Sequence, residues 1–556
     1  MKRIIAILFL SLLVAFSVFS QGENDLSKYI LTPKEKPTPR INGARVVGVR
    51  PGSEFLFKIA ATGKRPMTFE AKNLPKGLSI DKQSGIISGK VKKRGEFVVN
   101  LTALNEYGEY HQTLRIKVGD EIALTPPMGW NSWNCWGQSV SQEKVLSSAR
   151  ALIEKGLDQY GWTYMNIDDG WQGKRGGKYN AIQPNKKFPD MKALSDELHG
   201  MGLKLGIYST PWVGTYAGHI GSYSDNEDGT YQWIEQGINC TDEYKFERPN
   251  WKKERSRREH YYHGRHSFVK NDVKQWVEWG VDYLKYDWNP NDLYYTKEMS
   301  DALRESGRDI IYSISNHVPF ADIDKLWPLV NCYRTTGDIR DTWKSILKLG
   351  FTQERWRAFH HPGHWADPDM LVVGTVGWGP KLHNTKLTVA EQYTHISLWA
   401  LLASPLLIGC DIASMDEFTR SLLTNSEVID INQDPLGVHA AALVLNDNEA
   451  VYAKHLEDGS LAVGLFNLSS QPRRIKISQK ILGTRGEKTL RDVWRQQDIY
   501  KWTSVDDTFE AEIEPHGTML LTISPKNYDQ KTEGFSEVQL KNYRKHMNKI
   551  GLKPIY

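Results

Sequence analysis

A lysine and an aspartate, Lys285 and Asp287, close a short β-prone apolar run that begins at Val281. Such a run is typical of a strand that is buried on both faces. Because the two residues are two positions apart on a strand, their side chains point to the same side. An unpaired buried charge is costly, so Lys285 and Asp287 must pair with each other or with a ligand. By itself this pattern fits a structural ion pair as well as a functional site.

Other short apolar runs also end in polar side chains. These runs and the residues that follow them are 164–167 with Asp168 and Asp169, 204–207 with Tyr208, 310–312 with Ser313 to Ser315, and 331–333 with Arg334. Polar groups at the carboxyl ends of successive strands are typical of the active face of a (β/α)8 barrel. The sequence therefore predicts a barrel whose functional residues gather at that face.

The 556 residues are too many for one ordinary domain, and a content of 40% hydrophobic and 25% charged residues is globular. Strand and helix patterns alternate over residues 120–437, which predicts a central (β/α)8 TIM barrel. Short alternating strands predict an N-terminal Ig-like β-sandwich at 41–119 and a C-terminal antiparallel β-sandwich at 438–525. Residues 21–40 are predicted to be a linker, and residues 526–556 a basic tail.

One long insertion is expected inside the barrel, because about 250 residues are typical of this fold. It spans residues 222–268, and its middle is rich in Lys and Arg with Trp251, Tyr261 and Tyr262 between them. Since it follows the third predicted strand, it should rise from the active face. It is either a solvated surface insertion or part of the substrate subsites.

The first twenty residues have the features of a secretory signal peptide. Lys2 and Arg3 precede an apolar run from Ile4 to Phe19, and the small Ser20 could mark a cleavage point. This predicts a periplasmic or secreted protein, and no later run is apolar enough to insert into a membrane. The net charge of +5 resides in the signal peptide and the basic tail, so nucleic acid is not predicted as a partner.

The cysteine and histidine spacings predict neither a metal site nor a disulfide scaffold, and no cofactor is expected. The chain has four widely scattered cysteines without a CxxC pair: Cys135, Cys240, Cys332 and Cys410. One histidine-rich stretch could be mistaken for a metal site but lacks a recognised ligand spacing; it contains His360, His361, His364, Asp367 and Asp369.

Five motifs in order resemble the family-27 glycoside hydrolases, the α-galactosidases and their close relatives. They are Met128–Trp133 (MGWNSW), Ile167–Trp171 (IDDGW), Leu284–Asp287 (LKYD), Trp365–Leu371 (WADPDML) and Ile431–Gly437 (INQDPLG). The resemblance covers about residues 124–437 and extends weakly into the C-terminal sandwich. It implies a retaining exo-glycosidase that hydrolyses terminal α-D-galactosides of an oligosaccharide or glycan without a cofactor.

By this resemblance, Asp287 is the nucleophile and Asp338 the acid/base. A retaining glycosidase needs two carboxylates roughly 5–5.5 Å apart across the anomeric carbon. One carboxylate attacks, while the other protonates the leaving oxygen and then activates water. The nearby Lys285 should favour the ionised form of Asp287.

The resemblance also implies the residues that bind the sugar. Asp168 and Asp169 match the pair that binds the 4- and 6-hydroxyls, Lys285 the ligand of the 3- and 4-hydroxyls, and Arg334 the 2-hydroxyl contact; Trp133 matches the platform under the sugar, Tyr208 a wall, and Asp369 a residue that closes the site. Adjacent residues on a regular strand point to opposite faces. The strand must therefore end near Asp168 if both aspartates are to bind.

Two departures from the family pattern bear on specificity and on disulfides. The family has a cysteine after the nucleophile strand, paired with one in the loop after the third strand, whereas this chain has Asn289 and no cysteine near Tyr216. Galactosidases show Cys-Glu-Trp at the loop that contacts the 2-position, and here Ser315 takes the place of the glutamate. The N-acetylgalactosaminidase relatives have a serine there, but with a small residue where Val318 stands.

Several functions therefore remain open at this stage. α-N-Acetylgalactosaminidase and isomaltodextranase are alternatives within the family. β-L-Arabinopyranosidase is disfavoured, because Asp168 and Asp169 keep the pair expected for a 6-hydroxymethyl group. A carbohydrate-binding protein on an inactive barrel is the alternative from another class, although both carboxylates are present.

Overall fold

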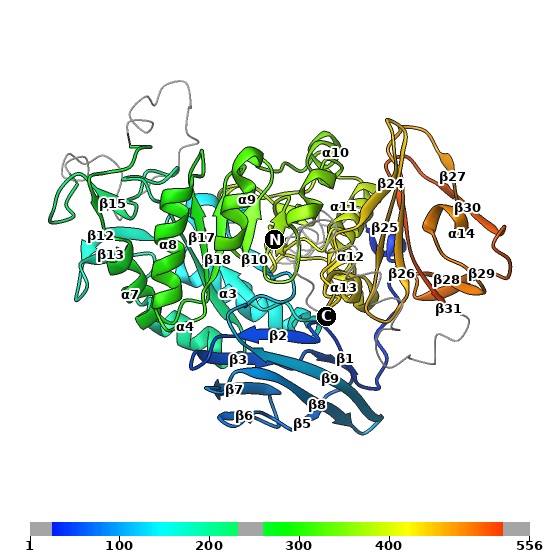
Figure 1. Cartoon of the computed structure of the whole chain (residues 1–556), viewed down its shortest axis with the longest axis horizontal. Helices are drawn as coiled ribbons and strands as arrows, with labels where there is room; N and C mark the ends of the chain where they lie inside the picture. Colours follow the sequence, from blue (N-terminus) through cyan, green and yellow to red (C-terminus); the bar gives the residue numbers. More distant parts are fainter. Residues whose placement is uncertain (1–24, 232–259, 526–556) are drawn as a thin grey trace, which may run out of the picture.

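The computed structural model describes residues 25–231 and 260–525. The predicted signal peptide, the basic tail and most of the expected insertion, including Cys240 and Trp251, lie outside these residues. An N-terminal β-sandwich, a central barrel and a C-terminal β-sandwich follow one another along the chain, and Figure 1 shows both sandwiches against the barrel. The predicted fold class is thereby confirmed.

Eight parallel strands form the barrel in the described part of the chain. In sheet order they are β20 (Trp365–Asp367), β19 (Cys332–Arg334), β18 (Ile311–Ser315), β17 (Tyr283–Asp287), β14 (Lys204–Ser209), β11 (Tyr164–Asn166), β10 (Met128–Asn131) and β23 (Leu406–Ile408). The ring closes beyond β20, where the N–H of Leu371 donates to the Leu407 carbonyl at 2.8 Å. Most strand residues are buried, as expected of strands covered on both faces.

Helices surround the barrel and connect its strands. They are α3 (Gln142–Glu154), α4 (Met191–Gly200), α7 (Val269–Trp279), α8 (Leu293–Glu305), α9 (Ile323–Leu326), α10 (Trp343–Gly350), α11 (Val389–Leu401), α12 (Glu417–Leu423) and α13 (Ser426–Asn432). Side-chain oxygens at the N-caps accept backbone N–H bonds and fix the helix starts, as at Ser141 of α3 and Asp292 of α8. Helix α11 is almost wholly buried, because it also contacts the C-terminal sandwich.

Short helices and β-pairs lie in the connections between the barrel strands. They are α2 (Trp133–Trp136), the β-pairs β12 (Gln172–Gly176) with β13 (Ala181–Pro184), β15 (Tyr223–Ser224) with β16 (His266–Ser267), and β21 (Thr375–Val376) with β22 (His383–Asn384). A buried ion pair anchors the first of these hairpins: Arg175 of β12 contacts Asp272 of α7 at 2.5 Å. The connections of the barrel are therefore held in place by charge as well as by apolar packing.

The N-terminal domain is a small sandwich of two sheets. One sheet holds β2 (Val46–Val49), β9 (Gly108–Val118), β8 (Gly95–Asn105) and β5 (Thr68–Lys72), and the other holds β3 (Glu54–Lys58), β7 (Ile86–Lys90) and β6 (Leu78–Ile80); β1 (Arg40–Ile41) pairs with β4 (Ala61–Thr62). Alternate residues such as Val99, Leu101 and Ala103 point into a common core. This alternation is the pattern that predicted the domain.

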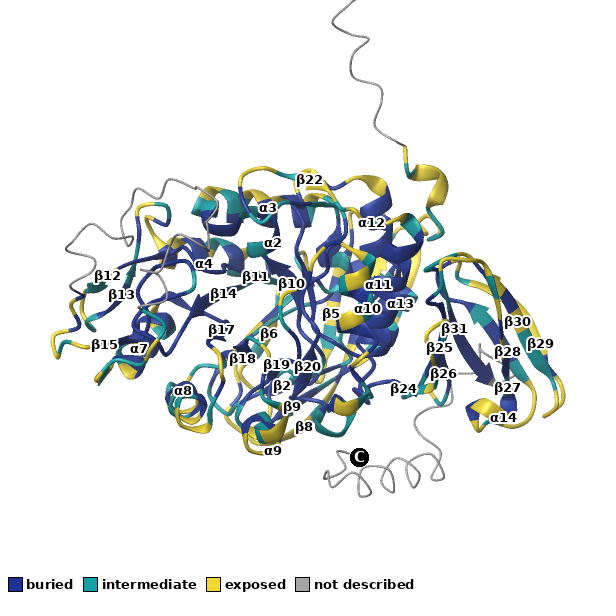
Figure 2. Ribbon diagram, turned by 90° about the horizontal axis from the view of Figure 1, so that it is seen from above, coloured by how far each residue is buried: buried dark blue, intermediate teal, exposed yellow. Residues whose placement is uncertain are grey.

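The C-terminal domain also packs two antiparallel sheets. The larger holds β24 (Ala441–Leu445), β25 (Glu449–His455), β26 (Leu461–Asn467), β31 (Thr518–Pro525), β28 (Lys488–Asp492) and β29 (Gln497–Trp502); the smaller pairs β27 (Arg473–Ser478) with β30 (Thr508–Ile513), joined to the rest through α14 (Gln479–Leu482). Figure 2 shows this sandwich beside α11 and α13, with buried residues between its sheets. It stabilises one side of the barrel.

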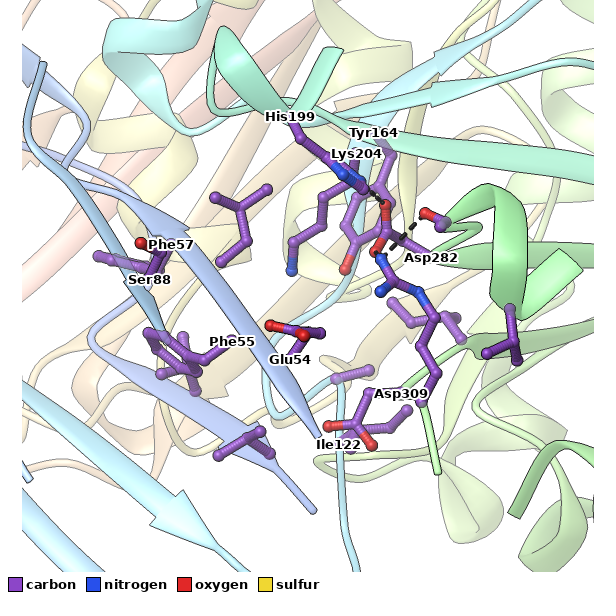
Figure 3. A pocket seen from close by; sticks show the side chains of 18 of the residues that line it. Glu54, Phe55, Phe57, Ser88, Ile122, Tyr164, His199, Lys204, Asp282 and Asp309 are labelled. Atoms are coloured by element: carbon purple, nitrogen blue, oxygen red, sulfur yellow. Dashed lines mark hydrogen bonds and ion pairs between the residues drawn. The ribbon is translucent and has the colours of Figure 1, made fainter. Parts of the chain in front are cut away.

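The N-terminal sandwich lies under the amino ends of the barrel strands, and residues of both line a cavity of about 350 Å³ in the contact region (Figure 3). Asp282, immediately before β17, lines this cavity and contacts His199 at 2.7 Å and Arg308 at 2.6 Å. In (β/α)8 barrels the amino end serves stability and the carboxyl end carries the chemistry. We therefore interpret this cavity as part of a domain interface.

Ion pairs join the N-terminal domain to both of its neighbours. Arg45 contacts Asp434 of the barrel at 3.2 Å, Arg115 contacts Glu457 of the C-terminal domain, and Lys58 contacts Asp158 at 2.7 Å. The segment that we expected to be a linker also packs on the barrel. Within residues 25–39, Glu35 contacts Arg420 at 2.6 Å and the N–H of Leu31 donates to the Tyr393 hydroxyl.

Within the described residues, no helix is long and apolar enough to cross a membrane.

Candidate active site

The strand ends bring the candidate residues together at the carboxyl end of the barrel. In the sheet register, Tyr208 of β14 lies beside Lys285 of β17, and Asp287 lies beside Ser315 of β18. Arg334 is the last residue of β19. This register brings side chains of neighbouring strands next to one another at two successive levels near the carboxyl end of the barrel.

Lys285 pairs with Asp168 and not with Asp287. The Lys285 ammonium is 2.8 Å from Asp168 Oδ2, and both side chains are buried. Burial alone would lower the pKa of Lys285, but the charges of Asp168 and then Asp287 raise it above its ordinary value. The ammonium therefore stays charged. Its Nζ also lies 5.4 Å from the ring centre of Tyr208.

Asp168 and Asp169 follow the end of β11 at Asn166, so both side chains can belong to the same site. The N–H of Asp169 donates to Asp168 Oδ1 at 2.9 Å, and the N–H of Ala217 donates to Asp169 Oδ2 at 2.8 Å. Burial raises the pKa of Asp169 to about 7. Its Oδ1 is buried without a hydrogen-bond partner among the described residues.

Asp287 is buried at the end of β17, and its Oδ1 has no hydrogen-bond partner in the described part of the chain. Burial raises the pKa of Asp287 to about 7, and the charge of Lys285 only partly offsets this effect. The sequence correctly predicted the direction of the lysine's influence. It did not predict that desolvation would outweigh it.

Arg334 organises the other side of the site. Its guanidinium forms a buried ion pair with Asp369 at 2.9 Å and lies 3.3 Å from Asp338. Asp369 itself is fixed by two backbone donors, the N–H of Ile339 at 2.8 Å and the N–H of Met370 at 2.9 Å. Asp338 is therefore held beside the site, although 55% of its side chain is open to solvent.

The two carboxylates that the sequence singled out have opposite pKa shifts. Partial burial would raise the pKa of Asp338, but the charges of Arg334 and then Lys285 outweigh it and lower the pKa below its ordinary value. The charge of Asp338 in turn contributes to the raised pKa of Asp287.

Several further polar atoms of the site are buried without a hydrogen-bond partner in the described residues. They are Tyr208 Oη, Ser315 Oγ, Asn316 Oδ1 and Arg334 Nε. Leaving a buried polar atom unpaired costs about 1–3 kcal/mol. A ligand with several hydroxyl groups would satisfy them, because each hydroxyl both donates and accepts. Trp133, half-buried at the start of α2, adds an aromatic side chain.

The histidine-rich stretch serves structure in the described residues. His360 Nδ1 accepts the N–H of Ala366 at 3.1 Å, and His364 Nδ1 donates to the carbonyl of Val330 at 2.7 Å. No group of three metal-ligating side chains occurs among residues 25–231 and 260–525. Cys135, Cys332 and Cys410 are free and buried.

Sequence reasoning missed the residues that support the site from loops. The backbone N–H of Ala217 holds Asp169, and that of Ile339 holds Asp369. Backbone donors leave no mark in residue type, so no signal could have identified them. Asn316 carried a signal, since it is a polar residue directly after the predicted strand end at Ser315.

Family models match all three parts of the chain. The model described as "Alpha galactosidase A" matches residues 125–262 and 254–434, which is more than half of the chain. The model "Alpha galactosidase C-terminal beta sandwich domain" matches residues 446–523, and "Putative Ig domain" matches residues 38–119. The chain is thus similar to these families from the first sandwich to the last.

Individual proteins show the same similarity. Alpha-galactosidase 3 of Arabidopsis thaliana is 33% identical over 427 residues, which cover 74% of this chain and 84% of the plant protein. The alpha-N-acetylgalactosaminidase of Gallus gallus is 28% identical, over 73% of this chain and 95% of that protein. A Bacteroides fragilis crystal structure described as a "putative alpha-galactosidase/melibiase" has a TM-score of 0.76 and 32% identity, covering 90% of this chain and 100% of the other.

The raised pKa of Asp287 predicts a stability cost at high pH. An aspartate whose pKa rises from 3.8 to about 7 on folding destabilises the fold progressively between about pH 4 and pH 7, and fully above that. Three pKa units correspond to roughly 4 kcal/mol. We expect Asp287→Asn to raise the free energy of unfolding by up to about this amount at pH 8 and by much less at pH 5. Denaturant unfolding at the two pH values measures the difference.

Asp282, on the same strand segment, supplies the matched control. His199 and Arg308 outweigh the effect of burial and lower its pKa, so its charge stabilises the fold above about pH 4. Asp282→Asn should therefore destabilise the protein at pH 8. If both substitutions destabilise it equally at pH 8, the unusual environment assigned to Asp287 is incorrect.

Proposed function

This chain belongs to the α-galactosidase A family of glycoside hydrolases, and on that premise we propose that it is a retaining exo-α-galactosidase. Its substrate would be a terminal α-D-galactosyl residue of an oligosaccharide or glycan. One observation carries the proposal beyond family membership. Asp287 and Asp338, whose pKa values are shifted in opposite directions, both lie at the carboxyl end of the barrel. Buried polar atoms there lack hydrogen-bond partners among the described residues.

The proposed reaction is a double displacement. The Asp287 carboxylate attacks the anomeric carbon while Asp338 gives its proton to the departing glycosidic oxygen, which leaves as an alcohol. A covalent galactosyl–Asp287 ester results. The Asp338 carboxylate then takes a proton from water, whose oxygen attacks the anomeric carbon and releases galactose with its original configuration.

The bound sugar must redistribute one proton between the two carboxylates. Without substrate, the pKa of Asp287 lies above that of Asp338, whereas the reaction needs the proton on Asp338. A sugar in the mouth would exclude water from the half-exposed Asp338 and raise its pKa. A sugar hydroxyl on Arg334 would weaken the contact that lowers the pKa of Asp338. The reaction needs Asp287 ionised and Asp338 protonated, so activity should depend on the protonation of both groups.

The remaining residues would bind the galactosyl ring in the way that the resemblance implies. Asp168 and Lys285 form an ion pair. The Asp168 carboxylate can still accept hydrogen bonds from sugar hydroxyls, and the Lys285 ammonium can still donate to them. Asp169 Oδ1 and Tyr208 Oη offer further partners. Asp369 would close the site through Arg334.

The 2-position of the sugar decides between galactose and N-acetylgalactosamine. The resemblance assigns Ser315 and Val318 to this position; both are buried, and Ser315 Oγ has no partner among the described residues. Serine frees volume compared with glutamate, and valine takes part of it back. Because Arg334 remains as a contact for a 2-hydroxyl, we favour galactose, with any acetamido activity minor. α-N-Acetylgalactosaminidase is the second candidate, supported by the serine and by the similarity to the Gallus gallus enzyme.

We also propose that the protein is exported, on the basis of Lys2, Arg3 and the apolar run that follows them. Protein recovered from the periplasm or medium should begin after about residue 20. Determination of its N-terminal sequence tests this, and an intact Met1 on the exported protein would argue against a cleaved signal.

Removal of the nucleophile tests the mechanism. We expect Asp287→Gly to be nearly inactive on a nitrophenyl α-galactoside, because it removes the carboxylate that forms the galactosyl ester. Azide should restore turnover and give the β-galactosyl azide, since it attacks once from the side that Asp287 occupied. NMR of the product establishes its anomeric configuration.

Asp338→Gly is the matched control. Azide should restore its activity through the intact ester and give an azide of retained α configuration. If Asp338→Gly instead gives the inverted β-azide and Asp287→Gly the retained α-azide, the roles of Asp287 and Asp338 are reversed. If wild-type protein hydrolyses no α-glycoside but binds galactose, the barrel is a binding protein.

The specificity prediction concerns Ser315. We expect wild-type kcat/KM to be higher on nitrophenyl α-galactoside than on nitrophenyl α-N-acetylgalactosaminide. Ser315→Glu should widen this ratio by about tenfold or more, because glutamate crowds an acetamido group and accepts from a 2-hydroxyl. Val318→Ala, which returns volume to the site, should narrow it. A wild-type preference for the acetamido sugar would replace the galactosidase assignment.

A further inference from the structure

Three aromatic side chains form a cluster in the connection after β14. The rings of Trp212 and Tyr261 stack with their centres 5.1 Å apart and their planes at 16°. Tyr216 packs edge-on against both, at 5.3 Å from Trp212 and 5.1 Å from Tyr261. We call these three residues the aromatic wall. Trp212 is buried within it, whereas Tyr216 and Tyr261 are half-buried and present part of their surface to solvent.

Backbone contacts tie the aromatic wall to the active site. The Tyr261 hydroxyl donates to the carbonyl of Tyr216 at 3.0 Å. The next residue, Ala217, donates its N–H to Asp169 and accepts from Gln138 through its carbonyl. Tyr216 therefore directly precedes the residue whose N–H holds the Asp169 carboxylate. The bond from Tyr261 and the contacts of Ala217 together fix its backbone.

The charges of the two proposed reacting carboxylates also act on Tyr216. Burial raises the pKa of its hydroxyl, and the charges of Asp287 and Asp338 both add to this effect. The hydroxyl consequently stays protonated at any working pH. Together with the Ala217 contact to Asp169, this influence indicates that Tyr216 faces the mouth where Asp287 and Asp338 lie.

The leaving group needs a surface of this kind. The galactosyl ring is bound by charged and polar groups on one side of the cleaved bond, namely Asp168, Asp169, Lys285 and Arg334. On the other side, Asp338 opens to solvent with 55% of its side chain, so a departing group can leave there. Flat aromatic rings bind the apolar face of a sugar ring or an aryl group without requiring a specific hydroxyl pattern.

The geometry points to the aromatic wall as the leaving-group subsite, in which the ring of Tyr216 contacts a neutral sugar or an aryl group joined to the galactosyl residue. This inference rests on the proposed function. It assigns a role to Tyr216 in a place where the family pattern has a cysteine and this chain has none.

Substrates that differ only in the leaving group test the assignment. α-Galactosyl fluoride has no ring to contact the wall, while nitrophenyl α-galactoside and an α-galactosyl disaccharide have one. We expect Tyr216→Ala to lower kcat/KM by about tenfold on the two ring-bearing substrates and by less than about twofold on the fluoride. The inhibition constant of galactose, which reports the galactosyl side, should not change.

Two further variants keep the test decisive. Tyr216→Phe retains the ring and should stay within about threefold of wild type on all three substrates. Tyr262→Ala removes a neighbouring exposed tyrosine whose hydroxyl instead contacts Asp225, and it should behave as wild type.

Equal losses on the fluoride and the disaccharide in Tyr216→Ala would show a structural role and overturn the subsite. A loss in Tyr216→Phe as large as in Tyr216→Ala would overturn the ring as the contact. Wild-type protein that cleaves none of the three galactosides would refute the proposed function itself, which is a different outcome from either of these.

Discussion

The buried ion pair between Lys285 and Asp168 is the interaction on which the active site depends. Each partner alone would be an uncompensated charge in a desolvated place, and breaking a buried pair of this kind typically costs about 3–5 kcal/mol. Together they hold β11 and β17 in register at the mouth, across the intervening β14. Among the described residues they also leave Asp287 without a cationic partner in direct contact, although it lies only two residues from Lys285 on the strand. A carboxylate that is already neutralised by a close ion pair would be a poorer nucleophile.

A second buried pair, between Arg334 and Asp369, does corresponding work on the opposite side. It fixes the guanidinium, and the guanidinium then lowers the pKa of Asp338 from 3.3 Å away. Lys285 and Arg334 thus have different roles in the site. Lys285 stabilises the polar floor that would bind the sugar, and Arg334 controls the group that would exchange a proton with solvent. The opposite pKa shifts of Asp287 and Asp338 follow from this division and from their different exposure.

Much of this arrangement could be predicted from local sequence, because strand periodicity and strand ends are local properties. The runs before Asp168, Tyr208, Lys285 and Arg334 gave the barrel and the face on which these residues lie. The partner of Lys285 could not be predicted, since 117 residues separate it from Asp168 and only the curvature of the closed barrel brings the two together. The packing of residues 25–39 on the barrel was also missed. A polar segment gives no periodic signal even when specific long-range contacts hold it in place. The chemical roles of Asp287 and Asp338 came from resemblance, and no residue pattern in this chain implies them independently.

The two ends of one strand show how the same residue type is used for opposite purposes. Asp282, just before β17, and Asp287, at its end, are both buried. Asp282 accepts from His199, Arg308 and the N–H of Leu205, so its charge is fully compensated and stabilises the interface with the N-terminal sandwich. Asp287 Oδ1 has no such partner among the described residues, so the ionised form of Asp287 at the carboxyl end of the strand destabilises the fold. The compensated Asp282 can support the uncompensated Asp287 because the buried strand β17 joins them. A rigid scaffold of this kind keeps a reactive carboxylate in place without neutralising it.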